Sequence, residues 1–176
     1  MGLDMYLYRF ERPAVTAGEP LITDEKYHAL WQSGNLEEVG YWRKANAIHR
    51  FFVNAVQDGE DDCCFHHEVT RSVLEDLRGR CKRIIESTAV VNPNIVKGMH
   101  YDFSSQSWQE LMEESETVAD EAVCDRELPT QGGFFFGGQC YDEWYLNHIA
   151  YTYELCDRLL EETDFESEML FYLSSW

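Results

Sequence analysis

Two long segments with helical periodicity constrain the fold of this 176-residue chain more than any other feature. Apolar residues recur at three- and four-residue spacing in residues 70–87, directly after the capping residue Thr70. The same spacing follows Asp142 and continues to about Glu162. Both segments begin with a good N-cap, so we expect two amphipathic helices that each bury one face.

The two ends of the chain have the pattern of β-strands. In "LDMYLYRF", apolar residues alternate with Asp4, Tyr6 and Tyr8, which is the period-two pattern of a strand. The closing segment "EMLFYLSSW" is also expected to be a strand. Shorter strands are predicted near "CFHHEV" and at "GGFFFGG", which glycines bracket.

The remaining segments complete the predicted order β-α-α-β-α-β-α-β. A short helix is predicted over 23–34, and the stretch "GYWRKANAIHR" is assigned to a second helix that runs to about Val56. The acidic stretch 107–127 could hold helix but is interpreted mostly as a solvated face or loop. This order predicts an α+β fold: one compact acidic domain over residues 1–176, with a small, mainly antiparallel sheet packed by three to four helices.

The formal net charge of −19 is unevenly distributed along the chain. Residues 98–176 hold 18 acidic residues against only Arg126 and Arg158, whereas residues 1–97 hold 15 acidic and 12 basic residues. Phosphate backbones would be repelled by the acidic half, which argues against direct nucleic-acid binding. No apolar run is long enough to span a membrane, and the first residues lack a secretory-signal pattern. We therefore expect no membrane partner and a cytoplasmic location.

The stretch "GYWRKANAIHR" has two interpretations. On a helical wheel His49 lies within an apolar arc with Trp42, and three polar residues border it: Arg43, Asn46 and Arg50. These five residues could line a ligand site, with His49 as acid/base and the arginines as an anion clamp. The structural alternative is a buried, hydrogen-bonded histidine beside arginines that pair with carboxylates. We favour the structural alternative.

Other motifs give weaker indications of chemistry. "CCFHH" offers Cys63, Cys64, His66 and His67, but adjacent residues on a strand point to opposite faces, so we predict no metal and no cofactor. The glycines before Asp142 and Glu143 suggest a phosphate loop, yet both carboxylates would repel an anion. The cysteines are expected to be free thiols, several of them buried.

The acidic residues of the second half form the preferred candidate for a functional surface. A cluster of carboxylates can match the field of a phosphate chain and so occupy a basic groove, as nucleic-acid mimics do. The alternative is an ordinary solvated surface. The candidate partner-binding residues are Glu110, Glu113, Glu114, Glu116, Asp120, Glu121 and Asp125.

Four motifs, "GLDMYL", "GYWRKANAIH", "LPTQGGFFFG" and "YDEWY", resemble those of a family of small uncharacterised proteins from phages and prophages. The resemblance covers most of the chain and is patchy between residues 88 and 127. It implies a phage-encoded accessory protein in the host cytoplasm, where inhibitors of host defence are common. The expected partner is a basic host protein or defence complex. The competing hypothesis is a small enzyme or nucleotide-binding protein that uses the Trp42, Arg43, Asn46 and His49 helix face together with aromatic residues from 134–145.

Overall fold

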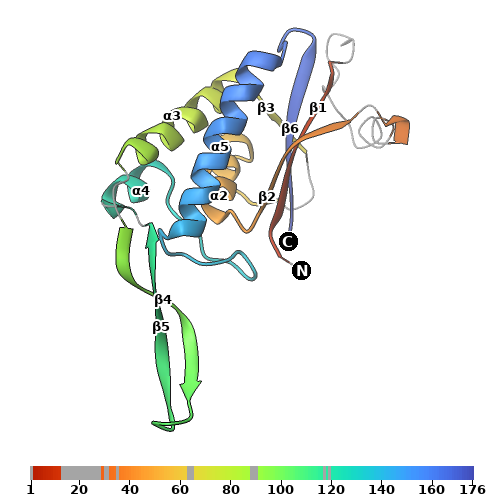
Figure 1. Cartoon of the computed structure of the whole chain (residues 1–176). Coiled ribbons are helices and arrows are strands. Elements are labelled where there is room, and N and C mark those ends of the chain that lie inside the picture. Colours follow the sequence, from red (N-terminus) through yellow and green to blue (C-terminus); the bar gives the residue numbers. More distant parts are fainter. Residues whose placement is uncertain are drawn as a thin grey trace.

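The computed structural model describes residues 2–12, 29, 32–34, 36–62, 66–87, 91–116, 118 and 120–176. These residues form an α+β fold with four helices, as predicted, but their strands make two antiparallel sheets and not the single small sheet that was expected (Figure 1). The strands are β1 (Asp4–Glu11), β2 (Glu37–Arg43), β3 (His67–Val69), β4 (Val91–Asp102), β5 (Ser107–Glu116) and β6 (Glu168–Ser175). The helices are α2 (Asn46–Val56), α3 (Arg71–Ser87), α4 (Glu121–Glu127) and α5 (Glu143–Glu162).

The main sheet has the order β2-β1-β6-β3, so the two ends of the described chain are neighbouring strands. The predicted alternation is confirmed up to Leu7, because Leu3, Met5 and Leu7 are fully buried in the main core whereas Asp4 and Tyr6 are only partly buried; Tyr8 is buried as well. In Figure 1, helices α2, α3 and α5 lie on one side of this sheet. Side chains of the opposite face form a smaller cluster: Phe10, Met169 and Phe171, with Leu36 packed against them.

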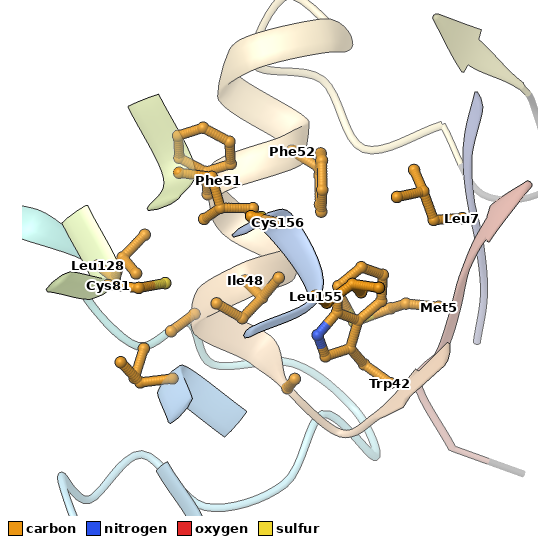
Figure 2. Close-up of a cluster of buried hydrophobic side chains, with 14 of the residues drawn as sticks. Met5, Leu7, Trp42, Ile48, Phe51, Phe52, Cys81, Leu128, Leu155 and Cys156 are labelled. Carbon is orange, nitrogen blue, oxygen red and sulfur yellow. The ribbon is translucent and has the colours of Figure 1, made fainter. Parts of the chain in front are cut away.

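Both predicted amphipathic helices are confirmed. The Asp142 carboxylate caps α5 by accepting a hydrogen bond from the Tyr145 amide at 3.1 Å, and Thr70 Oγ1 accepts one from the Val73 amide at 3.4 Å before α3. The buried faces meet at Cys81 of α3 and Cys156 of α5, which belong to one core cluster with residues of the sheet (Figure 2). The 3.6-residue period therefore identified the faces that pack together.

The helix assignment of "GYWRKANAIHR" is wrong for its first half. Residues 40–43 belong to strand β2, where Trp42 pairs with Met5 of β1, and helix α2 begins only at Asn46. Lys44 separates the two elements with a φ of 58°, a left-handed conformation that neither a strand nor a right-handed helix can continue. The local pattern was ambiguous, and pairing with β1 decided it.

Two further predictions are corrected. "GGFFFGG" is a loop with a turn in which the Phe136 amide bonds to the Gly133 carbonyl at 3.3 Å, and no strand forms over these described residues. The acidic stretch from 107 to 116 is strand β5 and pairs with β4 in a long hairpin rather than forming a loop. Figure 1 shows this β4–β5 hairpin projecting away from the helices and the main sheet.

The helix predicted over 23–34 lies largely outside the described residues. Cys63 and Cys64 also lie outside them. The short strand predicted near "CFHHEV" is confirmed as β3, which pairs with β6. Within the described part of the chain, no helix is both long enough and apolar enough to cross a membrane.

Candidate functional site

Asn46, the first residue of α2, holds the glycine-rich loop against the body of the protein. Its Nδ2 donates hydrogen bonds to the carbonyls of Gly138 at 2.8 Å and Phe136 at 3.3 Å. Its Oδ1 accepts a hydrogen bond from the Gln131 amide at 3.0 Å. The residue is only 4% exposed. Asn46 therefore positions the loop, and its amide is directed to backbone groups.

Replacing Asn46 with alanine is expected to lower the free energy of unfolding by about 2–3 kcal/mol, because part-buried backbone groups of the loop lose their partners. Urea denaturation followed by circular dichroism measures this change. Asn147→Ala is the matched control, since Asn147 is exposed on α5 and should change stability by no more than about 0.5 kcal/mol. Equal effects of the two substitutions would contradict the loop-holding role.

His49 lies in the interior and is fully buried. Its Nδ1 is 2.7 Å from the Tyr172 hydroxyl, and its Nε2 is 2.8 Å from Asp61 Oδ2. The ring thereby ties α2 to β6 and to the loop that follows α2. This is the buried, hydrogen-bonded arrangement of the structural alternative.

The two arginines of the stretch are separated by the change from strand to helix. Arg43 lies at the end of β2, where its Nε is 4.0 Å from Asp4 Oδ1 and its side chain is well exposed. Arg50 lies on α2 and donates from Nη1 to the Thr130 carbonyl at 3.1 Å. Arg43 therefore does not share a helix face with Asn46 and Arg50, contrary to what the helical wheel predicted. Arg43 is left free to take part in a different arrangement.

That arrangement is a cavity of about 650 Å³, here called the β2–α5 cavity. Its walls come from the end of β2, the first turn of α2, the loop 130–140 and the first half of α5. Trp42, Arg43 and Asn46 contribute to the lining, whereas His49 and Arg50 do not. A cavity of this size, lined mainly by apolar surface with a few polar groups, is typical of small-molecule sites.

Of the α5 wall of this cavity, the sequence hypothesis covered only Trp144 and Tyr145, through the aromatic residues of 134–145, and it missed His148 and Tyr151. Trp144, His148 and Tyr151 recur at positions i, i+4 and i+7, so they form a second stripe beside the buried stripe of α5. That spacing was available in the sequence. Burial lowers the pKa of His148, and this effect outweighs the opposing effects of Asp142 and of a hydrogen bond with the Arg43 backbone. The imidazole is thus neutral at pH 7, with one donor and one acceptor nitrogen.

The candidate acidic residues occupy two elements. Glu110, Glu113, Glu114 and Glu116 lie in β5, and Glu121 and Asp125 lie in α4. Asp120 caps α4 by accepting from the Ala122 amide at 3.0 Å, and the Asp125 carboxylate accepts a hydrogen bond from the Tyr141 hydroxyl. The acidic stretch therefore runs from the projecting hairpin into the helix that follows it.

The described cysteines behave as free thiols. Cys81, Cys124 and Cys156 are buried, and Cys140 is exposed on the lining of the β2–α5 cavity. Burial raises the pKa of Cys156 to about 12 and that of Cys81 well above its ordinary value, so both thiols are protonated at neutral pH. Among the described residues, no three His, Cys, Asp or Glu side chains are grouped to hold a metal ion.

Comparison of the chain with protein-family models, with curated proteins and with solved structures finds no match. The function must therefore be inferred from the chemistry of the chain's own surfaces.

Proposed function

We propose that this protein is a binding protein that engages a basic partner protein through the β4–β5 hairpin and the acidic residues that follow it. One observation carries the proposal: the hairpin projects from the body and exposes large apolar side chains (Figure 1). An isolated two-stranded hairpin is only marginally stable in water, so a second surface is expected to cover it. These exposed side chains are Val96, Met99, Tyr101, Phe103, Trp108, Leu111 and Met112.

The aromatic residues near the tip are the strongest candidates for anchors. Phe103 is 86% exposed and Trp108 is 65% exposed. Tyr101 pairs with Trp108 across the strands, with ring centroids 5.6 Å apart, and its ring lies 5.1 Å from that of Phe103. Exposed clusters of this kind are uncommon on monomeric proteins and mark interaction surfaces. Tryptophan and tyrosine are also enriched among the residues that dominate binding energy.

Hydrogen bonds within the turn close the tip of the hairpin. The Asp102 carboxylate accepts hydrogen bonds from the Ser105 hydroxyl at 2.7 Å and from the Ser104 amide at 2.9 Å. These bonds lower the pKa of Asp102, and the Ser105 bond has the largest effect. A preformed turn presents the aromatic cluster at a smaller entropic cost on binding.

Charge indicates which kind of partner fits this surface. The hairpin sequence 91–116 holds five acidic residues and one lysine, a formal charge of −4 within a chain of −19. Two such hairpins would repel each other, whereas a basic groove with an apolar floor would attract one. The sequence hypothesis of a nucleic-acid mimic fits this chemistry. On that hypothesis the protein is a phage-encoded inhibitor of a host defence complex and acts in the host cytoplasm.

Affinity capture from bacterial lysate with matched variants tests the proposal. The wild-type protein is expected to retain a basic partner that the double variant Phe103→Ser/Trp108→Ser loses. Glu110→Lys should weaken retention at low salt and reduce its salt dependence, because it reverses one charge on β5. A nucleic-acid mimic is further expected to compete with duplex DNA for the captured protein.

The control is Phe134→Ser, which removes an aromatic residue that is 79% exposed in the loop 130–140 rather than in the hairpin. It should retain the partner as the wild type does. Capture that survives the hairpin double variant would contradict the proposal. Sedimentation provides a second test. If the wild-type protein is a dimer and the double variant is a monomer, the hairpin is a contact between copies of this chain and the proposal is wrong.

A further inference from the structure

The β2–α5 cavity is bordered by aromatic side chains that remain exposed. Trp144 is 70% exposed, Tyr151 is 41% exposed and Tyr41 is 38% exposed, and all three belong to the lining. Leaving rings of this size in water forgoes the stabilisation that burial provides. The floor, in contrast, contains buried side chains of the core, including Trp42 and Ile149. The rim is therefore suited to accept a planar, largely apolar group between its rings.

Two adjacent cations lie on the same lining. Arg43 has only a marginal contact with Asp4 at 4.0 Å, and Lys44 makes no ion pair within the described part of the chain. Basic residues are scarce in this protein, whose sequence holds 14 of them against 33 acidic residues. The lining includes one carboxylate, Asp142, whose repulsion of an anion is partly offset by the helix N-terminus that it caps.

Lys44 is held at this position in a strained conformation. Its φ of 58° is uncommon for a residue with a side chain and costs free energy. The Lys44 amide donates a hydrogen bond to the Leu3 carbonyl at 2.7 Å, and Gly137 approaches so closely that a Cβ there would lie 3.2 Å from the Lys44 carbonyl oxygen. Glycine would suit this backbone better, and the chain instead places a cation there, on the lining of the cavity.

We infer that the β2–α5 cavity binds a small planar aromatic ligand that carries an acidic group, such as a nucleotide. The ring lies against Trp144 and Tyr151, and the phosphate or carboxylate pairs with Arg43 and Lys44. His148, whose N–H is bonded to the Arg43 backbone, offers its other ring nitrogen as an acceptor to the ring edge, and Asn147 of α5 supplies a further hydrogen bond. The inference is independent of the hairpin proposal, because it uses a different surface.

Calorimetric titration with two matched pairs of probes tests this ligand class. Adenosine monophosphate is compared with adenosine, and flavin mononucleotide with riboflavin, with inorganic phosphate alone as the fifth probe. At least one phosphorylated probe is expected to bind with one site per chain. Its unphosphorylated partner should bind about 10-fold more weakly, since it loses the charge-assisted contacts. Inorganic phosphate alone should bind more weakly still.

Variants separate the two halves of the site. Trp144→Ala should weaken both members of a pair about 10-fold or more through lost stacking. Lys44→Gly suits the left-handed backbone, so it should fold normally and weaken only the phosphorylated probe, about 5- to 10-fold. Phe134→Ala and Lys82→Ala are the aromatic and charge controls, and neither should change binding.

Chemical blocking of Cys140 gives a second readout. This exposed thiol lies on the lining, so N-phenylmaleimide should abolish probe binding in the wild type and leave it intact in Cys140→Ser. Failure of both phosphorylated probes to bind would overturn the inference. So would phosphorylated and unphosphorylated probes of equal affinity, or binding that Trp144→Ala and Lys44→Gly leave unchanged.

Discussion

Replacing Trp42 with alanine is expected to lower the free energy of unfolding by about 3–5 kcal/mol. The indole is 2% exposed and packs edge-on against Phe52, with ring centroids 5.9 Å apart. Its Nε1 donates a hydrogen bond to Thr152 Oγ1 at 2.8 Å. Alanine would leave a void between β2 and α5 and a buried hydroxyl without its partner. Urea denaturation followed by circular dichroism measures the change.

Two further substitutions separate the contribution of packing from that of the hydrogen bond and provide a control. Trp42→Phe keeps most of the packing and removes the donor to Thr152, so we expect about 1–3 kcal/mol. Trp144→Ala is the matched control, because this tryptophan is 70% exposed and its loss should cost no more than about 0.5 kcal/mol. If Trp144→Ala destabilised the protein as much as Trp42→Ala, the assignment of Trp42 to the core and Trp144 to the cavity rim would be wrong.

Replacing His49 with alanine is expected to cost about 2–4 kcal/mol, because it empties a fully buried position and removes two hydrogen bonds. The Tyr172 hydroxyl and the Asp61 carboxylate would each lose their imidazole partner. Tyr172→Phe removes only the hydroxyl, so its expected cost is about 1–2 kcal/mol.

The control for His49 is His100→Ala, since His100 is exposed on the β4–β5 hairpin. It should leave stability within about 0.5 kcal/mol of the wild type. Coupling between His49 and Tyr172 can be read from the double variant, whose cost should fall short of the sum of the two single costs. A His49→Ala protein as stable as the wild type would show that the ring does not tie α2 to β6.

The location of the candidate residues could be predicted only in part from sequence. Trp42, Arg43 and Asn46 were named, and all three lie on the β2–α5 cavity. Their grouping on one helix face was wrong, since the first two belong to a strand. Lys44 escaped notice because a left-handed φ at a lysine has no local signature. The hairpin was also missed, because its exposed pairing lacks the half-buried alternation that identifies a strand.

The sequence by itself determined the elements whose signals are local. Periodicity and caps identify α3 and α5, and period-two alternation identifies β1, because each pattern records which face of one element avoids water. Tertiary structure decided everything that depends on distant partners. Residues 40–43 form a strand because β1 offers them a hydrogen-bonding edge. The β2–α5 cavity exists because β2, the loop 130–140 and α5 come together in the folded protein. The pattern of residues within any one of these segments carries no information about the space that the three enclose.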